Sequence, residues 1–217
     1  MPKIAEAARA ARRDEIIAAA AECFARSGYH VTTMADIAEA ARVSKGTPYL
    51  YFPAKEALFI ALYEEWDCGL AAGIDAAVGG LTEPARRSPR AVLQAVASAV
   101  AAYVTGNPQT CRVLMEATTL AAYAPAIAAK VRAANAVTLD QLTGLFQAGI
   151  AARQWPPGTS PALQARLFIA GLYGLMAQWH TAPGSFSLEA AMAALAATSA
   201  AGPGGDGGDS EAEEAGT

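Results

Sequence analysis

The amino-acid sequence predicts an all-α protein built from two unequal helical domains. Hydrophobic residues make up 53% of its 217 residues and charged residues only 17%, with alanine dominant and strand-favouring runs scarce. Apolar residues recur at helical spacing over long stretches, and proline or glycine separates these stretches. We therefore expect packed helices throughout and no strand.

The first helix is predicted over residues 5–26, which contain neither proline nor glycine. Ile16, Ile17, Ala20 and Phe24 share one face of this helix at helical spacing, and Gly28 ends the pattern. This face should pack against the helices that follow.

Two short helices joined by a tight turn are predicted next, at residues 34–41 and 45–51. Thr33 and Asp36 have the spacing of a capping box, so the first of them should begin at Met34. Arg42 lies in the turn, and Ser44 can cap the second helix. Such a pair is typical of a helix-turn-helix, in which the second helix reaches base edges in the major groove of DNA.

The remaining helices are predicted at residues 55–72, 89–106, 108–121, 125–152, 161–180 and 187–199. We place the DNA-binding domain at residues 1–54 and a larger helical domain at 55–200. Residues 201–217 carry five acidic residues and no large apolar side chain, so we expect a disordered acidic tail.

The candidate DNA contacts lie in and around the second short helix. They include hydroxyls, cations and a glycine that lets the backbone approach DNA closely, namely Thr33, Arg42, Ser44, Lys45, Gly46, Thr47, Tyr49, Leu50, Tyr51 and Lys55. Partial core packing is the alternative for Tyr51. The N-terminal cations Lys3, Arg9, Arg12 and Arg13 either touch DNA or lie on a solvated helix start.

Residues 13–58 resemble the TetR family of transcriptional regulators. The resemblance rests on an ordered set of residues, namely Arg13, Ile16-Ile17, Ala20, Phe24, Gly28-Tyr29, Thr32-Thr33, Ile37-Ala38, Val43-Ser44, Gly46, Tyr49, Phe52, Lys55 and Leu58. Two positions depart from the family pattern. Pro48 replaces a leucine-like residue and lacks the N–H that would bond to Ser44. Arg42 stands where glycine is frequent. If the backbone is left-handed there, arginine is less stable than glycine at this position by about 1 kcal/mol.

The resemblance implies a small-molecule pocket inside the larger domain. The candidate lining residues are large or sulfur-containing side chains, namely Trp66, Tyr103, Cys111, Met115, Tyr123, Phe146, Phe168, Tyr173 and Met176. Most such side chains in a helical domain are simply core. Charges are sparse here, and Arg112 and Glu116 have the spacing of a surface ion pair. We therefore expect an apolar ligand with few phosphates.

The last two helices resemble the pair through which TetR regulators dimerise as a four-helix bundle. The expected interface consists of Leu167, Ala170, Gly171, Gly174, Gln178, Leu188, Met192 and Leu195. Glycines within a helix lower its stability, so close approach of another helix would explain Gly171 and Gly174. Packing within the chain is the alternative.

Other classes of protein find little support in the sequence. Cys23, Cys68 and Cys111 are far apart and form no CxxC pair, so neither a disulfide framework nor a metal site is expected, and no cofactor is predicted. The acidic residues have no catalytic spacing, which argues against an enzyme. The longest uncharged stretch is interrupted by polar residues, and no signal-peptide core is visible, so we expect a cytoplasmic protein without a membrane span.

The sequence thus predicts a homodimeric transcriptional regulator, a repressor that a small apolar ligand releases from a palindromic double-stranded DNA operator. A second domain that serves only as a dimerisation scaffold remains the alternative. We expect Tyr49→Phe and Lys55→Ala to weaken operator binding and flatten its dependence on salt.

Overall fold

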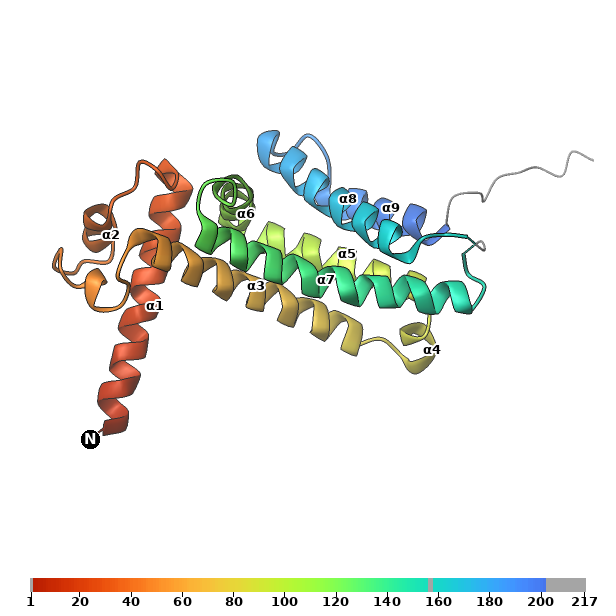
Figure 1. Cartoon of the computed structure of the whole chain (residues 1–217), viewed down its shortest axis with the longest axis horizontal. Coiled ribbons are helices and arrows are strands. Elements are labelled where there is room, and N and C mark those ends of the chain that lie inside the picture. The colour runs from red at the N-terminus through yellow and green to blue at the C-terminus, as the bar shows by residue number, and fades with distance from the viewer. Residues whose placement is uncertain (1, 156–157, 202–217) are drawn as a thin grey trace, which may run out of the picture.

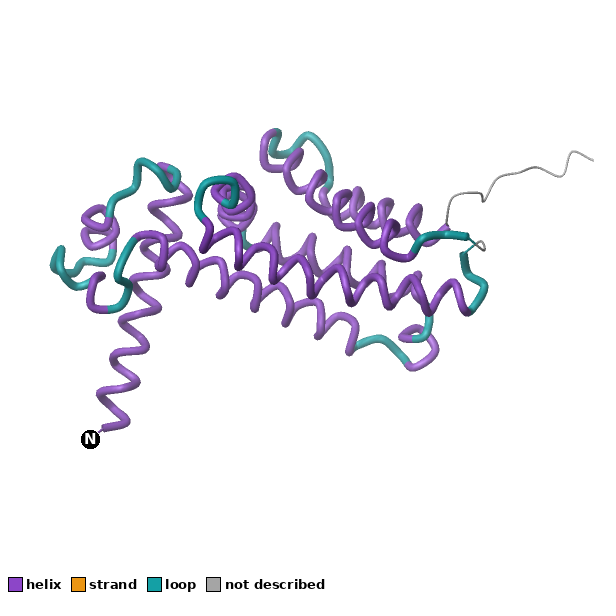
Figure 2. The backbone as a smooth tube through the Cα atoms, in the orientation of Figure 1, coloured by secondary structure: helices purple, strands orange, loops and turns teal. Residues whose placement is uncertain are grey.

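The computed structural model describes residues 2–155 and 158–201, and every regular element within these ranges is a helix (Figures 1 and 2). This confirms the all-α prediction. The predicted acidic tail lies outside the described residues except for Ala201, the last residue of the final helix.

Three elements form the N-terminal part of the fold. They are helix α1 (Pro2–Ser27), helix α2 (Met34–Ala40) and the short 3-10 helix η1 (Pro48–Leu50). The apolar face expected on α1 is buried, since Ile16, Ala20 and Phe24 are fully covered. In Figure 1 the N-terminal half of α1 extends away from the other helices.

The larger part of the fold contains seven helices. They are α3 (Lys55–Gly79), α4 (Glu83–Arg86), α5 (Pro89–Gly106), α6 (Pro108–Leu120), α7 (Pro125–Ala151), α8 (Pro161–Thr181) and α9 (Leu188–Ala201). Helices α5 to α8 each begin with proline, which lacks the N–H that a first helical turn leaves unpaired. The hydroxyls of Ser88 and Ser160 cap α5 and α8.

The long helices form two layers. Helices α3, α5 and α7 run along the long axis of the molecule, and α8 and α9 cover one side of them (Figure 1). Helix α9 packs on α5, and α8 packs on α7. Helix α6 is seen end-on in Figure 1, and it contacts both α1 and α8. It therefore joins the two parts of the fold.

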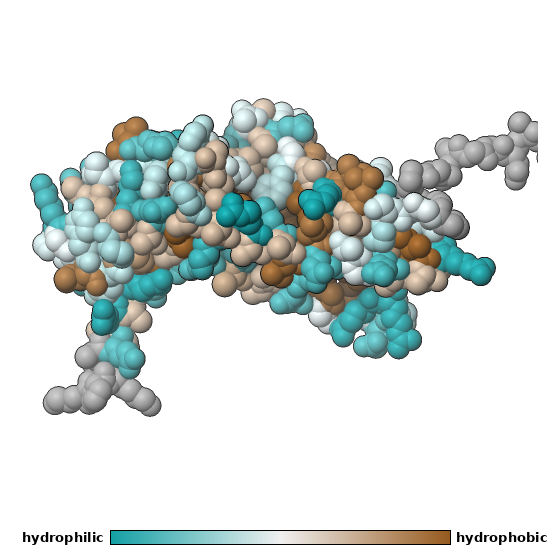
Figure 3. Space-filling view, in the orientation of Figure 1, coloured by the Kyte–Doolittle hydropathy of each residue, from teal (hydrophilic) through white to brown (hydrophobic). Residues whose placement is uncertain are grey.

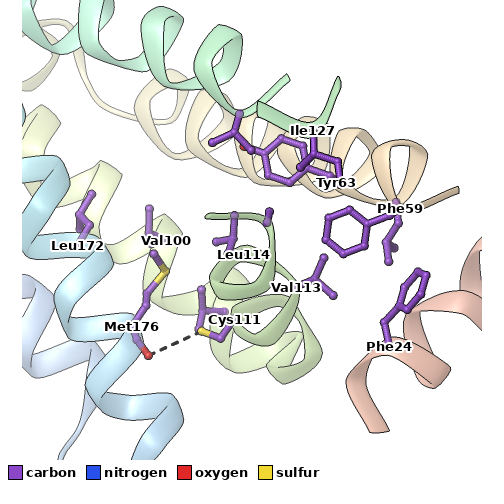
Figure 4. Close-up of a cluster of buried hydrophobic side chains, with 14 of the residues drawn as sticks. Phe24, Phe59, Tyr63, Val100, Cys111, Val113, Leu114, Ile127, Leu172 and Met176 are labelled. Atoms are coloured by element: carbon purple, nitrogen blue, oxygen red, sulfur yellow. Dashed lines mark hydrogen bonds between the residues drawn. The ribbon is translucent and has the colours of Figure 1, made fainter. Parts of the chain in front are cut away.

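One hydrophobic core continues from α1 to α8 through α6. Figure 4 shows Phe24 of α1 facing Phe59 of α3, whose ring lies 5.5 Å away edge-on, and then Val113 and Leu114 of α6. Beyond α6 the core continues to Met176 of α8. The N-terminal part therefore does not sit on a flexible linker but shares its interior with the rest of the chain.

The structure differs from the predicted elements at three places. Helix α3 continues to Gly79 instead of ending near residue 72, because Ile74 and Val78 pack against the core and extend its apolar face. The single turn α4 was not predicted. The expected helix over residues 45–51 is instead a turn followed by η1.

Two absences hold for the described residues. No helix there is long and apolar enough to cross a lipid bilayer. No group of three or more His, Cys, Asp or Glu residues lies close enough together to hold a metal ion.

Candidate DNA-binding surface

The predicted capping box at the start of α2 is confirmed. The Thr33 hydroxyl accepts a hydrogen bond from the Asp36 N–H at 3.2 Å, and the Asp36 carboxylate accepts one from the Thr33 N–H at 2.8 Å. These bonds to Thr33 lower the pKa of the Asp36 carboxyl. Thr33 therefore fixes where α2 begins, and its exposed hydroxyl also donates to the Asp36 carboxylate at 2.8 Å.

Arg42 has the left-handed backbone that its place in the turn suggested, with a φ of 54°. The Arg42 N–H bonds to the Glu39 carbonyl at 3.0 Å, and the Val43 N–H bonds to the Ala38 carbonyl at 2.9 Å. This is the Schellman arrangement that ends many helices, usually with glycine at the left-handed position. Arginine costs about 1 kcal/mol more than glycine there, and its side chain is exposed beside α2.

Pro48 explains why the segment after this turn is not an α-helix. Proline has no N–H, so the Ser44 carbonyl accepts its bond from Thr47 instead, at 2.9 Å. The following bonds from Tyr49, Leu50 and Tyr51 also span three residues. The Ser44 hydroxyl bonds to the Thr47 hydroxyl at 2.8 Å, so it does not cap a helix as predicted.

The tip of this segment projects into solvent. Tyr49 is 56% exposed and Leu50 73% exposed, and Lys45 and Gly46 are exposed as well. Open space surrounds the α-carbon of Gly46. A surface that projects in this way from a rigid support can enter a groove of DNA.

The base of the segment rests on α1. Pro48 and Phe52 are buried, and the guanidinium of Arg13 lies 5.3 Å from the Phe52 ring centre. The guanidinium of Arg9 lies 5.9 Å from the ring centre of the half-buried Tyr51. Tyr51 thus belongs partly to the packing between the segment and α1, and Arg9 and Arg13 contribute cations next to the projecting tip.

Lys55 has a role within the protein that the sequence did not suggest. Its ammonium donates to the carbonyl oxygens of Tyr29 at 2.6 Å, Thr32 at 2.7 Å and His30 at 3.3 Å, and it lies over the Tyr29 ring. Burial lowers the pKa of this ammonium. All three ammonium hydrogens therefore have partners in the loop between α1 and α2, which leaves none for a phosphate.

Glu116 of α6 also holds this loop. Its carboxylate accepts a hydrogen bond from the Tyr29 N–H at 2.6 Å. Gly28, with a φ of 79°, turns the chain there, and the Glu116 carboxylate lies next to its α-carbon. The expected surface pair between Glu116 and Arg112 is absent from the described contacts. Glu116 instead links the larger part of the fold to the DNA-binding part.

The nine predicted pocket residues do not come together in one place. Trp66 and Tyr103 pack edge-on, and the Tyr103 hydroxyl donates to the Trp66 carbonyl at 3.2 Å. Of the remaining seven residues, Cys111 and Met115 lie on α6, Phe146 on α7, Phe168, Tyr173 and Met176 on α8, and Tyr123 in the turn after α6. Cys111, Phe146, Phe168 and Met176 are buried, Met115 and Tyr173 are half-buried, and Tyr123 is 79% exposed.

Packing explains several of these positions. The Cys111 thiol lies 4.0 Å from the Met176 carbonyl (Figure 4), and burial raises its pKa to about 11. Phe146 packs against Trp155 at the far end of α7. Tyr123 lies in the turn that follows α6, so its prediction as an interior residue was wrong.

The predicted dimer residues divide into three groups. Leu188 and Met192 are covered by helices of the same chain, because α9 packs on α5, so their assignment to a surface was wrong. Leu195 fills the space beside Gly171, where a β-carbon would lie 2.6 Å from it. The other four residues, Leu167, Ala170, Gly174 and Gln178, lie along the outer side of α8.

Two family profiles match the chain. The profile of the bacterial regulatory proteins of the tetR family matches residues 16–62, and that of the BetI-type transcriptional repressor C-terminal domain matches residues 61–201. The second match alone covers more than half of the chain. Both profiles describe transcription regulators, and neither describes an enzyme.

Individual relatives agree with these profiles. An HTH-type transcriptional repressor of Mycobacterium tuberculosis is 42% identical over 30% of this chain and 35% of its own length. The transcriptional activator FasR of Mycolicibacterium smegmatis is 29% identical over 62% of this chain and 58% of its own length. The chain thus spans less than two thirds of either relative.

Solved structures show the same fold. The regulator FadR from Bacillus subtilis, determined in complex with stearoyl-CoA, superposes with a TM-score of 0.75. It is 22% identical, and the match covers 89% of this chain and 98% of FadR. The fatty acid degradation regulator FadR from Bacillus halodurans superposes with a TM-score of 0.73 at 22% identity, over 86% of this chain and 97% of that one.

Proposed function

The chain belongs to the TetR family of bacterial transcription regulators, and on that premise we propose that it is a homodimeric repressor that a small apolar ligand releases from a palindromic operator. It would act in the cytoplasm, where its operator DNA lies. The observation that carries the DNA-binding part is the exposed tip formed by Lys45, Gly46, Tyr49 and Leu50, which a buried base holds on α1. Its cations and hydroxyls suit phosphates, and its small residues allow close approach to bases.

Footprinting on the DNA upstream of its own coding region tests this proposal. We expect two protected half-sites whose centres are about 34–36 Å apart, as for other dimeric helix-turn-helix proteins. Lys45→Ala should reduce the slope of log affinity against log salt by about 1 per lost phosphate contact. Tyr49→Phe should weaken binding. Unchanged affinity in both variants would remove the tip as the DNA contact.

The outer side of α8 supports the homodimer. Leu163 is 53% exposed and Leu167 55% exposed, and both lie in line with Ala170 and Gly174. Figure 3 shows hydrophobic surface gathered over α7 and α8 on the face toward the viewer. An apolar stripe with small residues permits close packing against a second copy. Sedimentation should give a dimer for the wild type and a monomer for Leu167→Asp; a monomeric wild type would refute the arrangement.

The ligand of a structural neighbour and the paired cations of the larger domain support an apolar ligand. The FadR relative binds stearoyl-CoA, whose acyl chain is apolar but whose CoA part carries phosphates. Here Lys130 is paired with Glu64, and Arg86 and Arg87 with Glu83, so these cations are already engaged. A ligand at 100 times its Kd should stabilise the fold by about 2.7 kcal/mol. A thermal-shift screen without any hit would favour a dimerisation scaffold instead.

A further inference from the structure

A set of polar side chains lies in the larger domain, with Tyr63 buried and Asp67 exposed. Tyr63 of α3 is only 5% exposed, and its hydroxyl has no hydrogen-bond partner among the described residues. In Figure 4 its ring lies beside Ile127 of α7, with the hydroxyl end pointing away from Phe59. A buried hydroxyl without a partner is unfavourable, so Tyr63 calls for a partner from outside the chain.

Two more polar groups lie within electrostatic reach of Tyr63. Asp67 follows it by four residues and thus lies on the same side of α3. Tyr173 comes from α8, and its hydroxyl donates to the Asn135 side-chain oxygen of α7 at 3.4 Å. Burial raises the pKa of both tyrosines, and the charge of Asp67 raises them further. Three helices therefore bring these groups to one place.

The Asp67 carboxylate has no cation beside it. It forms no hydrogen bond or ion pair with the described residues, and the cation of the neighbouring helix, Lys130, is paired with Glu64. Although Asp67 keeps contact with solvent, burial raises the pKa of its carboxyl. The buried side chains next to Tyr173, Leu172 and Met176, are apolar. An exposed carboxylate without a partner among the described residues thus lies one helical turn from the buried Tyr63.

We propose that Tyr63, Asp67 and Tyr173 bind the polar end of the ligand, and that this ligand is an amine with an apolar body. The inference rests on the proposed ligand-responsive function. An ammonium supplies three donors, and a charge-assisted bond to Asp67 together with a bond to the Tyr63 oxygen would use two of them. Asp67 would repel a carboxylate or a phosphate at the same position.

Three probes with the same ten-carbon alkyl chain separate the contribution of the head group from that of the apolar body. They are n-decylamine, 1-decanol and decanoate, each used below its critical micelle concentration. Binding to the purified full-length protein at pH 7 is measured by calorimetry, together with the shift in melting temperature. We expect the amine to bind at least about tenfold more tightly than the alcohol, which is the scale of one charge-assisted bond, and decanoate to bind most weakly.

Variants then test the residues. Asp67→Asn and Tyr63→Phe should each weaken amine binding about tenfold. Asp67→Asn should change the affinity for the alcohol by less than twofold. Asp140→Asn is the matched control, because it removes the same charge from an exposed position on α7, and it should bind the amine like the wild type. Without ligand, Tyr63→Phe should melt no lower than the wild type, because its hydroxyl gives up no bond.

The outcomes distinguish this inference from the proposed function. If the three probes bind equally, or if the amine preference survives in Asp67→Asn and Tyr63→Phe, the amine site is wrong while ligand binding stands. If an apolar compound without an amine binds and the amine does not, the same conclusion follows. If no apolar compound of any class binds, both the amine site and the ligand-responsive function fail.

Discussion

Glu116→Ala is the substitution that most directly tests how the two parts of the molecule are joined. The carboxylate of Glu116 accepts a hydrogen bond from the Tyr29 N–H at 2.6 Å, in a partly buried setting. Bonds to charged groups contribute about 1.5–3 kcal/mol, and alanine would also leave the N–H without a partner. Because the site is only partly buried, we expect a loss of about 1–2 kcal/mol in the free energy of unfolding.

Urea denaturation measures this loss, and two controls give it meaning. Asp140→Ala removes an exposed carboxylate of α7 that has no partner among the described residues, and it should change stability by less than about 0.5 kcal/mol. Arg112→Ala should behave in the same way, since Arg112 does not pair with Glu116 in the structure. Hydrogen exchange adds a local measurement, because the Tyr29 amide should lose protection in Glu116→Ala alone.

Two results would refute the reasoning. One is a Glu116→Ala variant as stable as Asp140→Ala, with Tyr29 exchange unchanged. The other is an Arg112→Ala variant that loses as much stability as Glu116→Ala, which would restore the surface ion pair suggested by their spacing. Glu116→Gln is intermediate, because its amide oxygen still accepts a bond but carries no charge, and it should lose less than the alanine variant.

Three further substitutions test the local structure. Lys55→Met should lower the free energy of unfolding by about 1–3 kcal/mol, because three carbonyls lose their donor. The slope of log DNA affinity against log salt, measured by anisotropy titration, should stay unchanged. A smaller slope would show that Lys55 contacts a phosphate. Arg42→Gly should gain up to about 1 kcal/mol in urea denaturation by removing the cost of a left-handed arginine, and a clear loss would contradict that cost. Gly171→Ala should lower the free energy of unfolding by about 1–3 kcal/mol, because the added methyl group overlaps Leu195. Gly174→Ala is the control, because its methyl group meets open space and should not lower the stability of the monomer. Equal melting temperatures of the two variants would argue against the packing of α8 on α9.

Features that depend on neighbouring residues could be predicted from the sequence. The capping box of Thr33 and Asp36 and the proline starts of α5 to α8 involve groups within four positions of each other. The two family departures, Arg42 and Pro48, also marked two places between α2 and α3 where the backbone is unusual. The missing N–H of Pro48 explains the short 3-10 helix that replaced the expected recognition helix.

Features that depend on which surface covers another could not be predicted. The apolar pattern of α9 was visible, but the pattern is the same whether Leu188 and Met192 face α5 of the same chain or a second copy. Tyr63 has no distinguishing neighbour in the sequence, and only its burial without a partner draws attention to it. Glu116 has a plausible partner four residues away, whereas its actual partner is 87 residues distant.

The contacts of Glu116 and Lys55 give the loop between α1 and α2 a particular place in the proposed regulation. Both residues hold this loop, one from α6 and one from the start of α3, and the charge of Glu116 acts on Lys55. The coupling that a ligand needs to release an operator is about 1–3 kcal/mol, which is the size of one hydrogen bond to a charged group. A displacement of α6 that breaks the single bond to Tyr29 would therefore be sufficient. It follows that Glu116→Ala should keep binding the ligand while the ligand's effect on operator affinity shrinks, and an undiminished effect would place the coupling elsewhere in the core that α1, α3 and α6 share.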